Sequence, residues 1–160
     1  HIVKGCSLTD ARAASMFEDR KTLFVDLLGW DVPVVGGRYE IDSYDGDKAV
    51  YLIATDDGCI HQGSMRLLST EGAHLLCECD APRGEQVREI TRLCLPQRLG
   101  APGRLRVRNR LISAMVDHAL GSGITMLTGV VTAAFREEVL AMGWRAAPGA
   151  ITPEAAARAA

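Results

Sequence analysis

The sequence lacks a long apolar run, a marked excess of charge of either sign and an even number of cysteines. No stretch approaches the roughly 18 consecutive apolar residues that a membrane-spanning helix requires, so we expect no membrane partner. The first ten residues do not show the charged-then-apolar pattern of a secretory signal, which favours a cytoplasmic protein. The formal net charge of −2 gives no support for nucleic-acid binding.

The five cysteines and four histidines do not form a metal-binding pattern. An odd number of cysteines without a secretory signal argues against a disulfide framework. Cys77 and Cys79 are separated by one residue and have no second pair, whereas structural zinc sites use wider spacings. No histidine has another histidine three or four residues away. We therefore predict ordinary thiols and no metal site.

The length and composition of the chain are those of one globular domain. Its 160 residues are 48% hydrophobic and 24% charged, close to the averages for soluble domains. A chain of this length buries about 70% of the surface that it exposes when unfolded, so it needs no metal or disulfide to fold. We therefore expect a single domain over residues 1–160.

Hydrophobic periodicity and turn residues predict a mixed order of helices and strands. Asp57-Gly58 is a strong signal for a tight turn between two strands. The stretch 126–131 is predicted to be a buried strand. The expected helices are 11–28, 104–120 and 133–142, and the expected strands are 50–54, 59–67, 87–95 and 126–131. This order predicts an α/β domain with one sheet and helices packed on its faces.

Arg20 lies four residues before Phe24, so both side chains share one face of the first helix, and Trp30 follows soon after. An arginine in an apolar stripe is costly to bury unless a carboxylate meets it. The alternative is an arginine that extends from the helix edge to solvent. Acidic partners occur at Glu40, Asp42 and Asp45, which could equally be a solvated loop, and Arg66 alone resembles a surface residue.

Glu89 stands within the predicted strand 87–95, which also carries Ile90, Leu93 and Leu95, and a glutamate is unusual there if the strand is central. Burial there would raise the pKa of its carboxyl group, which suits a general base that works near neutral pH. In a regular strand Glu89 and Arg92 would face opposite sides. If both residues serve one cleft, the strand must carry a β-bulge near them.

Taken in order along the chain, these residues resemble the acyl-homoserine-lactone synthases of the LuxI type, the bacterial autoinducer synthases. The resemblance runs from about Arg20 to Trp144. It departs from the family at Arg88, where a tryptophan is usual, and in lacking a phenylalanine between Arg66 and Glu89. The chain also looks short near Leu76 and near Pro148, where we expect residues to be missing. The segments that carry the resemblance are 20–24, 28–30, 39–45, 63–68 and 89–92.

The resemblance implies a GNAT-like (acetyltransferase-like) α-β-α sandwich around one mixed, mostly antiparallel sheet. It implies transfer of an acyl chain from acyl carrier protein or acyl-CoA to the amine of S-adenosylmethionine, followed by lactonisation and release of methylthioadenosine. S-adenosylmethionine is then a substrate, and no cofactor is needed. Carried over by position, the catalytic residues are Glu89, Arg92, Asp45, Arg66 and Asp42, and the residues on the S-adenosylmethionine side are Arg20, Phe24, Trp30 and Glu40. The three arginines and the aspartates are expected to form a buried charge cluster.

The same resemblance places the acyl chain and the carrier. The acyl-chain pocket is assigned to Met126, Gly129, Val131 and Leu140, and glycine at 129 favours an unsubstituted chain. The arginine-rich stretch 98–110 contains no acid and suits an acidic acyl carrier protein, although a solvated helix face is an equal alternative. The expected docking residues are Arg98, Arg104 and Arg108.

Two other functions remain open from the sequence. One is an acetyl-CoA-dependent N-acetyltransferase, because the autoinducer synthases resemble that fold. Its pyrophosphate loop needs successive backbone N–H groups, whereas the loop at 97–102 ends in Pro102, which has none to donate. The other is an inactive protein that binds acyl groups or S-adenosylmethionine.

Overall fold

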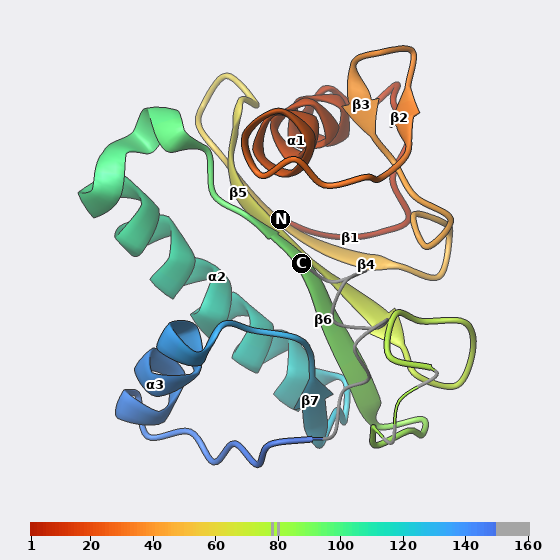
Figure 1. The fold of residues 1–160 in the computed structure, drawn as a ribbon, viewed down its shortest axis with the longest axis vertical. Helices are drawn as coiled ribbons and strands as arrows, with labels where there is room; N and C mark the ends of the chain where they lie inside the picture. The colour runs from red at the N-terminus through yellow and green to blue at the C-terminus, as the bar shows by residue number, and fades with distance from the viewer. Residues whose placement is uncertain (78, 80, 150–160) are drawn as a thin grey trace.

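The computed structural model describes residues 1–77, 79 and 81–149. Five strands form one sheet in the order β1-β4-β5-β6-β7, in which all neighbours are antiparallel except the parallel pair β6 and β7 (Figure 1). The strands are β1 (Ile2–Lys4), β4 (Val50–Thr55), β5 (His61–Ser69), β6 (Val87–Cys94) and β7 (Met126–Thr128). A separate two-stranded ribbon pairs β2 (Val34–Val35) with β3 (Tyr39–Glu40).

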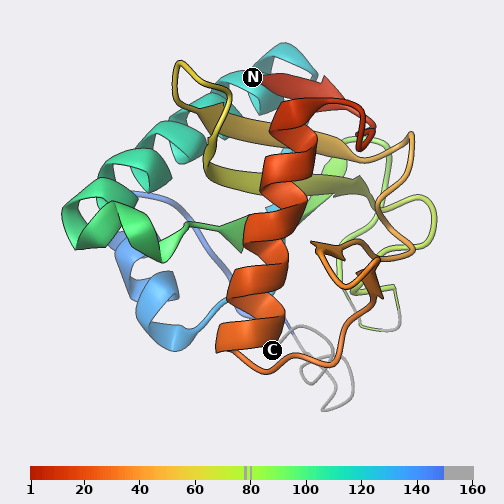
Figure 2. The same cartoon turned by 90° about the horizontal axis from the view of Figure 1, so that it is seen from above.

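Helices cover both faces of the sheet. The helix α1 (Ala11–Arg20) crosses one face together with the β2–β3 ribbon, as Figure 2 shows from above. The long helix α2 (Gly100–Gly121), preceded by a 3₁₀ turn at Gln97–Leu99, covers the other face beside α3 (Ala133–Ala141). The predicted α/β sandwich with a mixed, mostly antiparallel sheet is confirmed.

The first helix begins where the sequence predicts but changes its geometry part-way. Asp10 caps it by accepting a hydrogen bond from the backbone N–H of Arg12 at 2.9 Å. After Arg20 the chain continues as a π-helix over Lys21–Leu27. Gly29 follows the end of this helix, and its φ of +69° is a value that glycine adopts easily. Such π-turns are often found at functional sites, and this one carries the buried Phe24.

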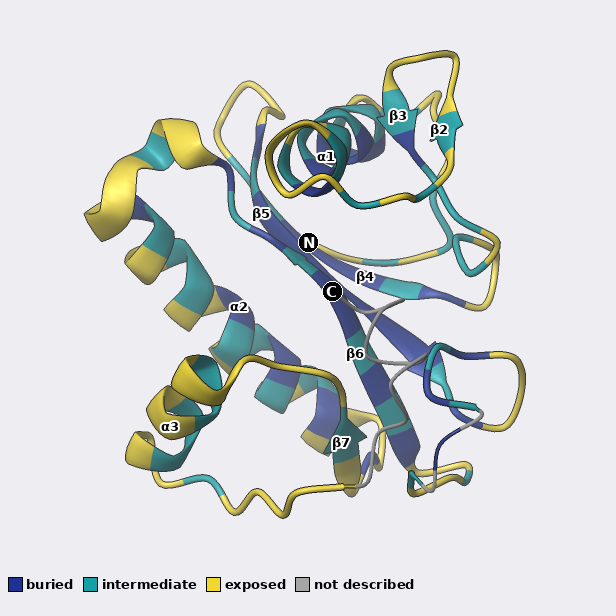
Figure 3. Cartoon of the chain, in the orientation of Figure 1, coloured by how far each residue is buried: buried dark blue, intermediate teal, exposed yellow. Residues whose placement is uncertain are grey.

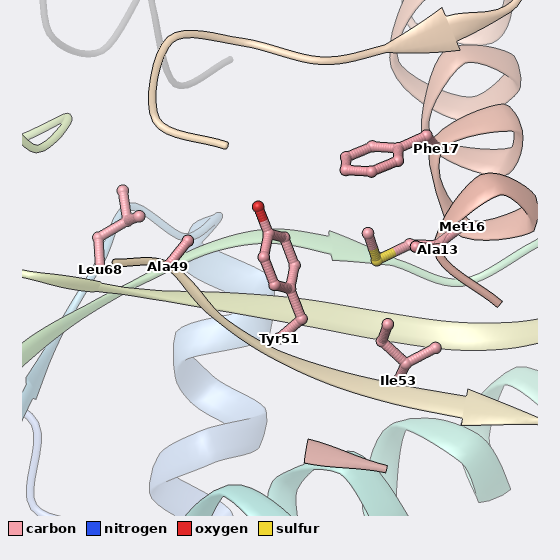
Figure 4. Close-up of a cluster of buried hydrophobic side chains, with 7 residues drawn as sticks. All are labelled: Ala13, Met16, Phe17, Ala49, Tyr51, Ile53 and Leu68. Atoms are coloured by element: carbon pink, nitrogen blue, oxygen red, sulfur yellow. The ribbon is translucent and has the colours of Figure 1, made fainter. Parts of the chain in front are cut away.

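The core has two layers because successive residues of a strand point to opposite faces. On the α1 side, Figure 4 shows Tyr51 and Ile53 of β4 facing Met16 and Phe17. On the α2 side, the intervening Leu52 packs with Met65 and Leu67 of β5 and with Leu111 and Met115 of α2. Figure 3 shows burial concentrated along the three central strands.

Two expectations about the elements were incomplete or wrong. The strands β1, β2 and β3 were not predicted because runs of two or three residues carry no readable periodicity. The expected buried strand at 126–131 is wrong: β7 stops at Thr128, and Met126 and Val131 are 46% and 51% exposed. The reason is that β7 lies at the edge of the sheet order, next to β6 alone.

Among the described residues, no helix is long and apolar enough to cross a membrane.

Candidate active site

Three arginines and three carboxylates meet between α1 and the sheet. Five of them form the buried charge cluster that the family resemblance implies, and Glu40, which was expected on the S-adenosylmethionine side, is the sixth member. The arginines come from three different elements, the end of α1, the middle of β5 and the bulge of β6, whereas the carboxylates follow one another along β3 and the loop after it. All six side chains are at least nine-tenths buried. The members are Arg20, Arg66, Arg92, Glu40, Asp42 and Asp45.

Arg20 joins the helix to the acidic loop. Its Nε donates to Glu40 Oε2 at 2.5 Å. Its two terminal nitrogens donate to the two oxygens of Asp45 at 2.9 and 2.8 Å, the bidentate geometry that suits a guanidinium. One arginine therefore holds two carboxylates that are five residues apart.

The other two arginines close the cluster into a ring. Arg66 donates to both oxygens of Asp42 at 2.6 and 2.9 Å and lies 2.7 Å from Asp45 Oδ1. Arg92 bonds Asp42 at 2.9 Å and Glu40 at 3.2 Å. Each charge therefore touches two of the opposite sign, and the ring is neutral overall, which is what allows six charges to be buried together.

The ring of charges lowers the pKa of Asp45. Burial alone would raise the pKa of Asp45, but hydrogen bonds and charge from Arg20, with further charge from Arg66, hold that pKa well below its usual value. Tyr51 donates its hydroxyl to Asp45 Oδ1 at 2.7 Å, and burial together with the charge of Asp45 raises the pKa of the phenol. Asp45 is thus fixed as a carboxylate.

Arg92 reaches the ring because β6 carries a β-bulge. Arg66 pairs with Thr91 and Ser64 pairs with Cys94, so two residues of β6 lie opposite the single residue Met65 of β5. The φ of Arg92 is +52°, an unusual value for a residue other than glycine. The bulge turns Arg92 to the face that Glu89 and Arg66 share, so the bulge predicted from the sequence is confirmed.

Two aromatic rings cover the Arg92 end of the ring of charges. Phe24 and Trp30 stack with their centroids 4.5 Å apart and their planes 14° from parallel. The Arg92 guanidinium lies 5.5 Å from each centroid, close enough for a cation–π contact with both. The sequence placed these two rings together correctly.

Glu89 lies on β6, the strand that also carries Arg92, and it is fully buried. Its Oε2 accepts a hydrogen bond from the backbone N–H of Leu75 at 2.8 Å. Its Oε1 has no hydrogen-bond partner among the described residues. Burial raises the pKa of the carboxyl group, and the hydrogen bond from the Leu75 N–H partly offsets that rise. A buried carboxyl with one open oxygen and a raised pKa can act as a general base.

Comparison with known proteins assigns the chain to a family. Residues 6–148 match the model of the autoinducer synthases. The chain belongs to the autoinducer synthase family. An acyl-homoserine-lactone synthase from Rhizobium etli is 35% identical over 161 residues, which cover 92% of this chain and 74% of the relative. The family resemblance seen in the sequence is therefore confirmed.

Solved structures agree with this assignment. TofI, crystallised in a ternary complex with an inhibitor and MTA, is 28% identical with a TM-score of 0.70, covering 89% of this chain and 77% of its own. A protein from Lactobacillus plantarum assigned to the N-acetyltransferases is 20% identical, with a TM-score of 0.66 over 96% of this chain and 90% of its own. The second likeness concerns the fold alone and agrees with the GNAT-like architecture of this autoinducer synthase.

The expected docking arginines of this autoinducer synthase are partly engaged within the molecule. Arg98 makes two bonds to Asp19, at 2.5 and 2.8 Å. Arg108 pairs with Glu138 of α3 and lies over the ring of Phe135. Within the described part of the chain, Arg104 makes one long contact of 3.4 Å, to a backbone carbonyl of the 3₁₀ turn.

The four residues assigned to the acyl chain lie on and after the edge strand β7. Leu140 is half-buried in α3, whereas Met126 and Val131 are about half exposed. Gly129 approaches β6 closely, because a Cβ built there would lie 2.9 Å from the Ile90 carbonyl oxygen. Only glycine lets the chain pass β6 at this distance.

A cavity of about 200 Å³ lies beside the π-helix, lined by Leu23, Leu27, Pro96, Gln97 and three further residues. Its lining contains no member of the ring of charges, and its volume is below the roughly 300–1,000 Å³ of pockets that hold drug-sized ligands. We therefore place the candidate active site at Glu89 and the stacked rings rather than in this cavity.

Among the described residues, no group of three or more His, Cys, Asp or Glu could hold a metal ion.

Sequence reasoning missed two residues of the site. Tyr51 lies in a predicted strand, but its contact with Asp45 depends on the path of the acidic loop. His74, a fully buried histidine next to Leu75, lies in the loop that covers Glu89. A lone histidine in a loop has no spacing pattern that could have pointed to it.

Proposed function

We propose that this chain is an acyl-homoserine-lactone synthase, carried by one domain. It transfers an acyl group from a thioester of acyl carrier protein or CoA to the amine of S-adenosylmethionine. Lactonisation of the product then releases methylthioadenosine. The observation that carries the proposal is the buried Glu89 carboxyl with one open oxygen, on the strand whose bulge brings Arg92 under two stacked aromatic rings. The name of the Rhizobium etli relative and the MTA bound to TofI support it.

In the first step the amine attacks the thioester carbonyl. A free α-amino group has a pKa of about 7.7–8.0, so at neutral pH it must lose a proton before it can attack. Glu89, whose pKa is raised by burial, takes this proton through its open oxygen. A C–N bond forms, the C–S bond of the thioester breaks, and the second proton that the nitrogen loses goes to the sulfur, so that the carrier leaves as a thiol.

In the second step the methionine carboxylate attacks the carbon that bears the sulfonium. A C–O bond forms, the C–S bond breaks, and neutral methylthioadenosine leaves with the electron pair. This step needs mainly correct positioning, because a sulfonium is an excellent leaving group. Phe24 and Trp30 are proposed to form the wall that holds the adenosylmethionine, whose positive sulfur a ring face attracts.

The ring of charges positions these groups. Arg20, Glu40 and Asp45 hold the π-helix, with its Phe24, against the sheet, and Asp42 and Arg66 hold the bulge. We assign to these residues a role in holding the site together, with Glu89 as the base. S-adenosylmethionine serves as a substrate, so the proposal needs no cofactor, and it places the protein in the cytoplasm with its substrates.

The acyl chain is proposed to lie along β7 and α3, next to Met126, Gly129, Val131 and Leu140. An acidic carrier protein is proposed to dock on the arginines at the start of α2, where Arg104 is the member with the weakest internal contact. A chain without a 3-oxo group remains the expectation at Gly129.

The decisive experiment mixes the purified protein with S-adenosylmethionine and an acyl thioester. Release of methylthioadenosine, followed by chromatography, and a lactone of the expected mass support the synthase. An acetyltransferase would acetylate an amine and release no methylthioadenosine. A protein that only binds would show affinity for S-adenosylmethionine without turnover, and either outcome would refute the proposal.

A further inference from the structure

The loop that covers Glu89 contains a second buried group with an open acceptor atom. His74 is fully buried. Its Nδ1 lies 2.7 Å from the carbonyl oxygen of Gly72. A carbonyl only accepts, so Nδ1 carries the proton, and in the neutral imidazole Nε2 is then the acceptor. That Nε2 has no hydrogen-bond partner among the described residues.

His74 and Glu89 are held close together. The backbone N–H of Leu75, the residue directly after His74, donates to Glu89 Oε2 at 2.8 Å. The imidazole also acts on the carboxyl electrostatically, because a positive charge on His74 lowers the pKa that burial has raised. The other charged group that acts on Glu89 from a neighbouring element is Arg66 of β5. Glu89 Oε1 and His74 Nε2 are therefore two buried acceptors without a described partner, and the Leu75 N–H joins the backbone next to His74 to the Glu89 carboxyl.

Two buried acceptors without donors are costly, and each such group ordinarily finds a partner. The chemistry of the proposed reaction gives them a use. When an ammonium group becomes an amide, its nitrogen loses two protons. One proton ends on the sulfur of the leaving thiol, and the other is released to solvent. Glu89 can hold only one of them at a time.

Resting on the proposed synthase function, we propose that His74 is the second proton acceptor of the amide-forming step. Glu89 takes the first proton from the ammonium and passes it to His74 Nε2, directly or through one water molecule. Glu89 is then a carboxylate again when the attacking nitrogen gives up its second proton. That proton goes from Glu89 to the sulfur as the C–S bond breaks, and His74 later releases the first proton to solvent.

The test compares His74→Asn and His74→Gln with the unchanged protein. Asparagine can keep the donor to the Gly72 carbonyl but has nothing at the position of Nε2. Glutamine can place an amide group near that position but cannot take up a proton. His118→Gln, on the helix α2 of the opposite layer, is the matched control and should leave activity unchanged.

We expect both His74 variants to lower kcat at pH 7 by about tenfold or more, in line with the loss of a proton acceptor, with KM for S-adenosylmethionine unchanged. The deficit should shrink as the pH rises past about 8, because the substrate amine is then already neutral and only one proton must leave. A structural defect would lower activity equally at every pH. Thermal unfolding checks that each variant is folded.

Three results would overturn the role of His74: full activity in both variants, a deficit that does not change with pH, or recovery of activity in His74→Gln. In each case the unchanged protein still releases methylthioadenosine, and the proposed function stands. If the unchanged protein releases none, the proposed function itself fails.

Discussion

Tyr51, near the start of β4, donates its hydroxyl to Asp45 at 2.7 Å and so ties the second strand of the sheet order to the ring of charges. Substitution by phenylalanine would remove only the hydroxyl group, and the ring would keep its edge-on packing against Phe17. Removing this hydrogen bond therefore weakens the ring of charges without removing any of its charges.

We expect Tyr51→Phe to lower the free energy of unfolding by about 0.5–1.5 kcal/mol, the usual contribution of one hydrogen bond. Asp45 keeps its bonds to Arg20 and Arg66, so activity should remain within a few-fold of the unchanged protein. Urea unfolding measures the change. Tyr39→Phe is the control, because it keeps the contact of the ring with Arg38. Equal stability of both variants would argue against the Tyr51 bond.

Removing the charge of Asp45 should have a much larger effect. Asp45→Asn leaves Arg20 and Arg66 without one of their partners, and breaking a buried ion pair in this way costs about 3–5 kcal/mol. The exposed turn variant Asp57→Asn serves as the control. Any loss of activity in Asp45→Asn must therefore be compared with its unfolding curve, because the loss can come from loss of the fold.

The same substitution predicts a pH dependence. The pKa of Asp45 is lowered in the folded protein, so its contribution to stability is complete above the unfolded pKa of about 3.9 and is lost as the pH falls towards the folded pKa. The unchanged protein and Asp45→Asn should differ most at pH 7 and converge in strong acid. A difference that persists undiminished at low pH would contradict the assignment.

Glu89→Gln should separate activity from stability. Loss of the base is expected to lower kcat by about 100-fold or more. Since burial raises the pKa of Glu89, its carboxylate destabilises the fold as the pH rises, and the neutral amide removes that cost. Glu89→Gln should therefore be more stable than the unchanged protein at pH 7 and about equal to it near pH 4. Unfolding in urea at both pH values checks this, and a variant less stable at pH 7 would count against a strained, buried base.

Arg104→Glu tests carrier docking with little structural disturbance, whereas Arg108 and Arg98 are already paired with Glu138 and Asp19. We expect about a fivefold rise in KM for an acyl carrier protein thioester at low salt, fading at high salt. KM for an acyl-CoA should not change. Arg145→Glu, beyond α3, is the control. Unchanged kinetics with the carrier-bound substrate would leave the alternative of a solvated helix face.

The sequence predicted five of the six members of the ring through the family resemblance, which had placed Glu40 on the S-adenosylmethionine side, and it predicted the need for a bulge from local chemistry. A buried arginine requires a carboxylate, and Glu89 and Arg92 can share a face only if the strand between them is irregular. It could not predict that the six charges close on themselves, since the pairing depends on how the loop after β3 crosses the sheet.

Other features depend on tertiary contacts that no local pattern contains. The change from α-helix to π-helix at Lys21 leaves hydrophobic spacing almost unaltered, so one continuous helix was predicted. The apolar residues after Thr125 suggested burial, but a strand at the edge of the sheet keeps much of its surface. The segments near Leu76 and Pro148 lie next to residues outside the described part of the chain, and the expectation of missing residues there stays a prediction.

The strand β6 is one residue longer than the stretch of β5 against which it lies, and the surplus falls between Thr91 and Cys94. If Leu93 were deleted, the two strands could pair without interruption. Arg92 would then point towards Leu111 and Met115 of α2, and Glu40 and Asp42 would each lose a counter-charge. The position of Arg92 in the candidate active site therefore depends on a mismatch in length between two neighbouring strands.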